Sequence, residues 1–553
     1  MFHTVIRVYP RTHRIRFAKF PRSFVVTRLS KAALKRAVDH LIRYGDTDVL
    51  PHPIEAVFLS EKRTAIIDEL SKLDLDAFNP TQALETIAPK SKLGFRIIHQ
   101  LPLVETILFT ASIIEIGPDL EKLKRPIEEF GPFAYRFLDH ESPSIFMAER
   151  SFRKWLEWQH DQVDVDKYPN IILTDIADFY QRIYFHRIEN ILDSATEKHG
   201  VTGFIKKLIK QIRSKQSHGI PVGGSASRLI AEVVLSDTDS ALADEEYFFT
   251  RYVDDFRLFV RADESPYAVL AFLAEQLATS EGLSLNAQKS RIMSAEDFNA
   301  YLDRQLTDVF NEAEQSAIES LGATLYSDEE PNEHEIERLR GLNLLELLEE
   351  ETLRETWDFG RIRAIFFGLR FTADPLAAEF FAERLQRFLP FVKEMVLLIQ
   401  ELHKNGIDLS DFGKSVLDEL RGRAACSVPT VRFWLLELYV RGCLKLAPKD
   451  VSAVAQGDTF ANRQGFLIRG LNRDVNFFRR NKTRFDQLNS FEKFSFLLGA
   501  TCLPKDEFKT WVSAVRVGMD RPLDRLFCAW VQSKWGQLSN LVDSREEVAR
   551  EHA

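Results

Sequence analysis

The stretch YFFTRYVDDFRLFVRA, residues 247–262, decides the fold. Two short apolar runs, Tyr247–Val253 and Phe256–Val260, flank the adjacent acids Asp254 and Asp255. Because aromatic and β-branched residues crowd both sides of a turn-favouring dipeptide, the pattern predicts a strand, a tight acidic turn and a second strand. Two carboxylates at a hairpin tip repel each other unless a cation lies beside them, and a divalent metal ion meets that need. A solvated surface hairpin is the alternative, and the rest of the chain has to decide between the two.

Length and composition bound the class of protein. At 553 residues, 45% of them hydrophobic, the chain has room for about three or four globular domains. It contains no run of about 18 apolar residues, so we expect no transmembrane helix and no membrane partner. The four cysteines lie in the C-terminal third without a CxxC pair, which favours buried thiols in a reducing compartment over a zinc site or disulfides. They are Cys426, Cys443, Cys502 and Cys528.

The N-terminal segment is basic although the net charge of the chain is −9. Met1–Val38 contains Arg and Lys throughout and no acidic residue. Three interpretations compete: an arm that contacts phosphates, an Arg-rich transit peptide, and a basic face that docks on an acidic partner. Pro10 and Pro21 and a strand-like alternation make the segment a poor amphipathic transit helix, so we favour a folded basic element over residues 1–50. Within it, apolar residues at helical spacing predict a helix over Ser30–Tyr44 with Ser30 as its N-cap.

A third acidic residue follows a short apolar run upstream of the hairpin. Ile171–Leu173 fits a buried strand, and Asp175 lies just past it. An aspartate at a strand end is held by a rigid element and can reach a metal, although capping a helix is the commoner role. The apolar spacing over Phe179–Leu192 predicts that a helix follows.

A glycine-rich loop and a helix lie between Asp175 and the hairpin. The sequence HGIPVGGSASRLIAEVVL, His218–Leu235, allows close approach of another chain or ligand at its glycines, and Ser225 or Ser227 is placed to cap the helix. A helix N-terminus can present amides to phosphate. The loop lacks the lysine of a Walker A motif and is not a nucleophile elbow, so a kinase or hydrolase is disfavoured. After the hairpin come a helix and a basic extended segment, Leu283–Met293.

The order of these elements resembles the palm of reverse transcriptases over about residues 140–300. The wording DIADFY, HGIPVGG and RYVDDF is most similar to the abortive-infection (Abi) polymerases of bacteria, in the AbiK-like group. The resemblance implies an α+β fold: right-hand polymerase fingers and palm, with a mixed or antiparallel sheet and helices. It also implies that an all-α, HEAT-like helical-repeat domain follows in place of a thumb, and the helical patterns after the palm, among them Ile336–Glu350 and Val392–Lys404, show no strict period.

The resemblance also implies a division of the chain. We expect a basic N-terminal element at 1–50, fingers at 51–170, a reverse-transcriptase-like palm at 171–300, a connector at 301–335 and the helical-repeat domain at 336–553. The connector includes the acidic, proline-containing stretch Ser327–Glu335.

Nucleotidyl transfer builds negative charge on the attacking, phosphoryl and leaving oxygens, and two carboxylate-bound metal ions neutralise it. By resemblance, the catalytic residues and metal ligands are Asp175 and Asp254, with Asp255 as a looser third carboxylate. The backbone carbonyl of Ile176 completes one site. The implied cofactor is Mg²⁺, as two ions, for which Mn²⁺ can substitute.

The resemblance extends to the incoming nucleotide. Tyr180 matches the position whose ring lies beneath the sugar and clashes with a 2′-hydroxyl, so dNTPs are the expected substrates; a core tyrosine is the alternative. His218 stands where templated reverse transcriptases usually carry Gln, which puts ordinary contacts to a templating pair in doubt. The other expected nucleotide-binding residues are Gly219, Pro221 and Lys289 in the palm and Arg150, Arg153 and Lys154 in the fingers, for the last three of which a solvated helix face is the alternative.

Without a thumb, a polymerase grips duplex product poorly. The resemblance implies that a Tyr hydroxyl primes template-independent synthesis, that single-stranded DNA stays covalently attached, and that the enzyme is a homo-oligomer, trimer or hexamer, acting against phage in the bacterial cytoplasm. Tyr44, at a Gly-flanked helix end, and Tyr9, in basic surroundings, are the candidate priming residues. The alternatives are a templated enzyme working with a noncoding RNA and a catalytically inactive helical scaffold, against which the intact acids weigh.

Overall fold

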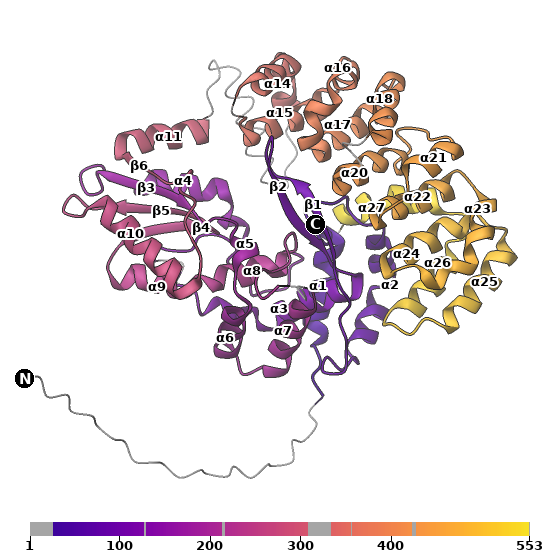
Figure 1. Ribbon diagram of the computed structural model, residues 1–553, viewed down its shortest axis with the longest axis horizontal. Coiled ribbons are helices and arrows are strands. Elements are labelled where there is room, and N and C mark those ends of the chain that lie inside the picture. The colour runs from indigo at the N-terminus through magenta and orange to yellow at the C-terminus, as the bar shows by residue number, and fades with distance from the viewer. Residues whose placement is uncertain are drawn as a thin grey trace, which may run out of the picture.

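The structure is a computed structural model that describes residues 26–126, 129–212, 216–307, 333–355, 357–422 and 427–551. Figure 1 shows the N-terminal helices and a long two-stranded hairpin at the centre, with a sheet region on one side and an arc of C-terminal helices on the other. Within the described ranges, no helix is both long and apolar enough to cross a membrane.

The N-terminal region is a helical core carrying a hairpin. Helix α1 (Lys31–Tyr44) packs on α2 (Glu55–Leu70) and α3 (Leu103–Glu121), and the Ser30 side chain caps α1 as predicted. Strands β1 (Leu84–Pro89) and β2 (Phe95–Gln100) form an antiparallel hairpin that the sequence analysis did not foresee.

The described part of the predicted basic element is folded into this core. Lys31 pairs with Asp68, Lys35 pairs with Glu141, and the buried Arg36 donates to backbone carbonyls. These cations are therefore bound to the protein itself. The remainder of that element, including Tyr9, lies outside the described residues.

The predicted palm contains a four-stranded antiparallel sheet, called the palm sheet from here on, in the order β4-β5-β3-β6. Its strands are β3 (Asn170–Asp175), β4 (Phe248–Tyr252), β5 (Asp255–Val260) and β6 (Arg291–Ser294). The predicted strands at Ile171–Leu173 and on both sides of the acidic turn are confirmed. The predicted extended segment contributes only its last residues, as β6.

Helices cover both faces of this sheet because the central strands β3 and β5 carry apolar side chains on both sides. On one face, Ile171, Leu173 and Phe259 pack with Trp155 of α4 (Phe152–Gln162) and with α11 (Ala295–Thr307). The opposite face belongs to the main core, which the intervening helices share. Those helices are α5 (Phe179–Arg182), α6 (Phe185–Ala195), α7 (His199–Ile212), α8 (Ser225–Val234), α9 (Ser236–Asp244) and α10 (Pro266–Gln276). Helix α11 crosses the predicted palm boundary at residue 300.

The C-terminal half is helical, as predicted. In the interior row, α15, α17, α20, α22 and α24 each contact the next, while α16 and α18 pack beside them, and α27 returns to α1 and α2 (Figure 1). The helices are α13 (Glu333–Arg340), α14 (Leu344–Leu353), α15 (Phe359–Thr372), α16 (Ala377–Arg384), α17 (Val392–Lys404), α18 (Ser410–Arg421), α20 (Pro429–Val440), α21 (Pro448–Val454), α22 (Thr459–Leu471), α23 (Val475–Asn481), α24 (Ser490–Gly499), α25 (Lys505–Val517), α26 (Asp524–Ser533) and α27 (Leu538–Glu551).

The first helices of this half and the segment before them differ from the sequence prediction or lie outside the described residues. The helix expected over Ile336–Glu350 is wrong in its continuity: α13 ends at Arg340, and Asn343 then caps α14, because a Gly-Leu-Asn segment favours a break. The predicted connector falls mostly outside the described residues, which resume at 333.

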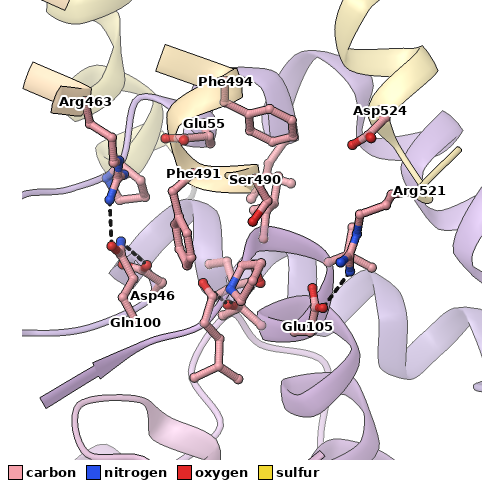
Figure 2. Close-up of a pocket in the computed structure, with 18 residues that line it drawn as sticks. Asp46, Glu55, Gln100, Glu105, Arg463, Ser490, Phe491, Phe494, Arg521 and Asp524 are labelled. Carbon is pink, nitrogen blue, oxygen red and sulfur yellow. Dashed lines mark hydrogen bonds and ion pairs between the residues drawn. The ribbon is translucent and has the colours of Figure 1, made fainter. Parts of the chain in front are cut away.

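The C-terminal helices are docked on the N-terminal core through buried polar pairs. Arg463 donates to Gln100 (2.6 Å), which in turn donates to Asp46 (2.7 Å), and Arg521 pairs with Glu105 (2.5 Å). Figure 2 shows these side chains facing one another across a small cavity of about 50 Å³. The contacts fix the C-terminal helices relative to the segment that follows α1.

The cysteines are buried thiols where they are described. Cys443 and Cys528 are buried and Cys502 is partly buried, and none of the three forms a disulfide with another described residue. Burial raises the pKa of Cys443 to about 11 and that of Cys528 to about 12, so these thiols are unreactive near neutral pH. Cys426 lies outside the described residues.

Candidate active site

The three acids selected from the sequence meet at one end of the palm sheet. In the β3–β5 pairing Asp175 lies directly opposite Asp255, and in the β4–β5 pairing Tyr252 lies opposite Asp255. Val253 and Asp254 therefore form the two-residue turn of the hairpin. The Ile176 amide donates to the Asp254 carbonyl (3.2 Å), which ties the turn to the end of β3.

The turn is conformationally strained. Val253 has φ +59°, a left-handed value that costs a β-branched residue on the order of 1–3 kcal/mol. Such a conformation persists only where the surroundings enforce it, and here a buried guanidinium does so: Arg251 Nη1 donates to the Val253 carbonyl (3.0 Å). The same side chain pairs with Glu232 and Asp239, both buried.

The electrostatics of the acids follow from burial and crowding. Burial, reinforced by Asp255 and Asp175, raises the pKa of Asp254 to about 7. Burial also raises the pKa of Asp255, against the opposing charge of Arg257, and Asp175 raises it further. The site thus holds more negative charge than it can stabilise alone, which is the condition under which a cation binds.

Lys289 neutralises part of that negative charge. Its ammonium bonds to Asp175 Oδ2, and although partial burial opposes the charged form, this bond raises the pKa of Lys289. The other oxygen, Asp175 Oδ1, is buried and has no hydrogen-bond partner among the described residues. A buried carboxylate oxygen without a hydrogen-bond partner destabilises the fold, so Asp175 Oδ1 is available as a ligand for a cation.

The donor set fits a divalent metal ion. Carboxylate oxygens on Asp175, Asp254 and Asp255, with an orphaned oxygen among them, are the ligands that Mg²⁺ prefers. In the part of the chain that the structure describes, no three His, Cys, Asp or Glu side chains stand in an arrangement that would already hold an ion. On either side of Ile176, the Ala177 amide donates to the Ser284 carbonyl and the Asn286 amide donates to the Asp175 carbonyl. The Ile176 carbonyl takes no part in these two hydrogen bonds.

Tyr180 lies beside the acids. Burial raises the pKa of its phenol well above the usual value, and the neighbouring Tyr135 and Asp254 raise it further. The guanidinium of Arg228 stands over the Tyr135 ring at 5.3 Å. Tyr180 therefore lies within electrostatic range of Asp254, Tyr135 and Arg228.

The glycine-rich loop closes another side of the site. The Ile220 amide donates to the Tyr180 carbonyl (2.9 Å), and His218 Nδ1 lies 2.9 Å from the Gln181 carbonyl, so the loop is bonded to the segment after β3. Gly219 and Pro221 are buried in this connection. The His218 side chain is thus engaged with the palm backbone.

One detail of the loop differs from the prediction. Gly224, and neither Ser225 nor Ser227, is the N-cap of α8, and Ser225 is the first helical residue with its hydroxyl bonded to His40 Nε2 (3.0 Å). The glycine before it is conformationally required: Gly223 has φ +120°, and a Cβ there would lie 2.5 Å from Thr47 Oγ1.

The basic residues expected from the fingers lie on α4 and just before it. Arg153 and Lys154 are on α4, which covers a face of the palm sheet, and both pair with Glu157 of the same helix. Arg150 stands just before α4 with its guanidinium over the Phe133 ring at 4.7 Å. The charges of Arg153 and Lys154 are therefore paired within α4.

Sequence reasoning missed several cations near the acids. Lys90, at the end of β1, is close enough to Asp255 to lower its pKa, and Arg96 of β2 is within electrostatic range of Arg228 and Asp48. Arg228 itself pairs with Asp48 (2.8 Å). Arg228 stands in the quoted HGIPVGGSASRLIAE stretch and could have been selected there, whereas Lys90 and Arg96 carry no local signal.

Of the two candidate priming tyrosines, only Tyr44 is described. It ends α1 and is 41% exposed, with its ring 4.9 Å from that of His40 one turn earlier. Because His40 bonds to Ser225, this end of α1 lies against the N-terminus of α8 and its glycine-rich loop.

Comparison with known proteins defines the class. Residues 120–325 match the family described as "Reverse transcriptase (RNA-dependent DNA polymerase)". The chain therefore contains a reverse transcriptase domain, of the nucleotidyltransferase and DNA polymerase class, and this span includes all three acids, Tyr180 and Lys289.

Solved structures add distant similarities. One is the apo telomerase of Candida tropicalis, at 14% identity over 68% of this chain and 74% of that chain, with a TM-score of 0.30. Another is the telomerase of Candida albicans in complex with a TWJ fragment of telomeric RNA, at 12% identity over 75% and 70%, with a TM-score of 0.30. The Candida tropicalis telomerase in the corresponding complex gives 12% identity over 72% and 67%, with a TM-score of 0.32. No curated protein matches the chain.

Proposed function

We propose that this protein is a DNA polymerase of the reverse-transcriptase type whose catalytic acids are Asp175, Asp254 and Asp255. The observation that carries the proposal is their convergence: β3 and the strained turn bring three carboxylates to one sheet end, with an orphaned oxygen and a pKa raised to about 7. Such an arrangement is costly for the metal-free fold and has a use once cations bind.

The acids would hold two Mg²⁺ ions, which when bound neutralise charge on the reacting phosphate and favour ionisation of the attacking hydroxyl. The chain's own residues then have distinct tasks. Lys289, already at the carboxylate edge, offers a positive charge to the triphosphate side of the site. The Tyr180 ring, beside Asp254, restricts the sugar to one without a 2′-hydroxyl. Arg251 holds the turn that carries Asp254.

The finer proposal follows the Abi resemblance. We propose that synthesis is primed by a tyrosine hydroxyl without a template, that the single-stranded DNA stays attached to the protein, and that the enzyme is a homo-oligomer serving antiphage defence in bacterial cytoplasm. The C-terminal helices, with neighbouring helices packed in a row, are consistent with a HEAT-like array standing where a thumb would grip duplex. Tyr44 is the candidate primer, because it is exposed and lies beside the glycine-rich loop.

The test is mass spectrometry of the purified protein after incubation with dNTPs and Mg²⁺ but no template, followed by nuclease digestion. The proposal expects a residual nucleotide on Tyr44 and none in Tyr44→Phe protein. A DNA product with no adduct on any tyrosine would reject protein priming while leaving the polymerase assignment intact.

A templated enzyme is the second candidate, favoured by the match to a family described as RNA-dependent. Supplying a defined RNA with an annealed DNA primer distinguishes templated from template-independent synthesis. Complementary product of defined length indicates templated synthesis, whereas product of unrelated sequence indicates synthesis without a template.

A further inference from the structure

A groove runs between the β1–β2 hairpin and the C-terminal helices α15, α17 and α20. Its volume is about 690 Å³, within the range of roughly 300–1,000 Å³ typical of ligand sites. Two connections build its floor: Trp434 Nε1 donates to the Val49 carbonyl (2.9 Å), and Thr430 donates to the Ile87 carbonyl (2.8 Å). We call this feature the basic groove, for the cations that line it: Lys90, Arg96, Arg363, Arg370 and Lys393.

The charges of the basic groove do not cancel. Among its described lining residues only Asp48 and Glu394 are acidic, against those five cations. Glu394 pairs with Arg363 (3.0 Å), but Lys393 donates to the backbone carbonyl of Asp48, which leaves its charge uncompensated by that bond. The lining therefore carries a net positive charge in a chain whose overall charge is negative.

Two of these arginines destabilise the fold because their buried N–H groups have no acceptor among the described residues. Arg96 Nε and Arg370 Nε are buried and have no hydrogen-bond partner in the described part of the chain. A buried guanidinium N–H without an acceptor is destabilising, so a site that keeps two of them is arranged for an acceptor supplied from outside. A phosphate oxygen is such an acceptor, and it also supplies the missing negative charge.

The basic groove leads to the catalytic acids. Lys90 lies at its hairpin end and within electrostatic range of Asp255. Asp48, on its wall, pairs with Arg228, which stands over Tyr135 beside Tyr180. From there the cations continue along Arg363 and Arg370 of α15. A line of positive charge that extends from the active site over a second region suits a polymer of phosphates better than one triphosphate.

The other basic and aromatic segment of the C-terminal half offers no comparable site. In α23 and the residues after it, Arg479 and Lys482 both pair with Glu507, and Phe478 is buried. Its cations are already compensated by that carboxylate.

We infer that the basic groove holds a single strand of nucleic acid that enters or leaves the active site, through phosphate contacts with Arg363, Arg370 and Lys393 on the C-terminal helices. The inference rests on the proposed function, because it takes the acids beside Lys90 to be the site of synthesis. It assigns the C-terminal helices a direct role in binding the strand.

The test is fluorescence anisotropy of labelled oligo(dT) and oligo(rU) on full-length protein carrying Asp254→Asn, without nucleotides, so that the strand is not extended. We expect the Arg363→Gln/Arg370→Gln pair to weaken binding about tenfold or more. The slope of log K against log salt should fall in magnitude by about 1.4, because each phosphate contact of a single strand contributes about 0.7. Replacing both arginines with lysine should keep the slope.

The matched control is Lys414→Gln/Arg480→Gln, which removes two exposed cations outside the basic groove and should change neither affinity nor slope. If the Arg370 variant does not fold, Arg363→Gln/Lys393→Gln takes its place. Tighter binding of oligo(dT) identifies the strand as product and tighter binding of oligo(rU) identifies it as template; either supports the inference. Equal weakening by the control pair, or unchanged affinity and slope in the groove variants, overturns it.

Failure of this inference and failure of the proposed function give different results. Groove variants that bind both oligonucleotides normally, in a protein whose parent makes DNA, overturn the inference alone. Groove-dependent binding in a parent protein that incorporates no nucleotide supports the basic groove and rejects the polymerase.

Discussion

Replacement of Arg251 with methionine should loosen the hairpin formed by β4 and β5. The guanidinium is fully buried and donates to both carboxylate oxygens of Asp239 (2.8 and 2.7 Å), to Glu232 Oε2 (2.7 Å) and to the carbonyls of Glu232 (2.9 Å) and Val253 (3.0 Å). Its removal leaves two buried carboxylates without their cation. Breaking a buried pair in this way typically costs about 3–5 kcal/mol.

Hydrogen exchange measured by mass spectrometry on peptides covering β4 and β5 reads out this loss. At about 1.4 kcal/mol per factor of ten, the protection of these amides should fall roughly a hundredfold or more. The matched control is Arg261→Met, which removes a partly exposed ion pair with Glu264 just after β5 and should change stability by about 1 kcal/mol or less.

The pH dependence of amide protection in Arg251→Met protein is a second measurement of this loss. Burial raises the pKa of Glu232 even in the presence of Arg251, and without the arginine that pKa should rise further. A carboxyl whose folded pKa lies above its unfolded value destabilises the fold as pH rises through the folded value. The deficit of Arg251→Met should therefore shrink on acidification from about pH 7 to pH 5, after correction for intrinsic exchange rates. Unchanged protection of β4 and β5 in Arg251→Met would refute the reasoning.

Three further predictions follow from the site. In metal-free buffer, Asp254→Asn should raise the melting temperature at pH 8 more than at pH 5, because the raised pKa of about 7 means that ionised Asp254 destabilises the fold as pH rises; a larger gain at pH 5 would contradict this. Gly223→Ala should destabilise by about 1–3 kcal/mol in thermal unfolding, since it combines φ +120° with a Cβ 2.5 Å from Thr47 Oγ1, whereas Gly224→Ala, with 3.6 Å to its nearest neighbour, should be tolerated; equal effects would count against the close approach. Tyr180→Ala should incorporate ribonucleotides in a competition assay, and continued rejection of them would remove Tyr180 from the sugar site.

The parts of the fold that the sequence predicted are those where local pattern and turn chemistry agree. The acidic dipeptide between two aromatic runs specified β4, the turn and β5, and Ser30 before an apolar periodicity specified the start of α1. Helix α17 was predicted with the bounds that the structure shows, Val392–Lys404, because its apolar spacing is strong. In contrast, the β1–β2 hairpin was missed, since polar residues such as Arg96 and His99 break its alternation and its stability depends on contacts with α20.

The residues of the candidate site also divide into those with a local sequence signal and those without one. Asp175 and Asp254, with Asp255 as a third carboxylate, were grouped in advance through the reverse-transcriptase resemblance, and the strand register places Asp175 opposite Asp255. The partners of Arg251 could not be predicted, because Glu232 and Asp239 are brought to it only by the packing of α8 and α9 behind the sheet. The ion pairs of Arg153 and Lys154 were not predicted for a similar reason: a basic helix face has no local signal that says whether its charges meet a substrate or a neighbouring Glu157.

The most direct test of the central claim is incorporation of radiolabelled dNTPs by purified protein in the presence of Mg²⁺, compared with Asp254→Asn protein. This substitution removes the charge of the turn carboxylate with almost no change in shape. The account predicts labelled DNA from the parent protein, none from Asp254→Asn, and none from either after chelation of the metal. DNA synthesis by Asp254→Asn at the parental rate would contradict the assignment of the active site.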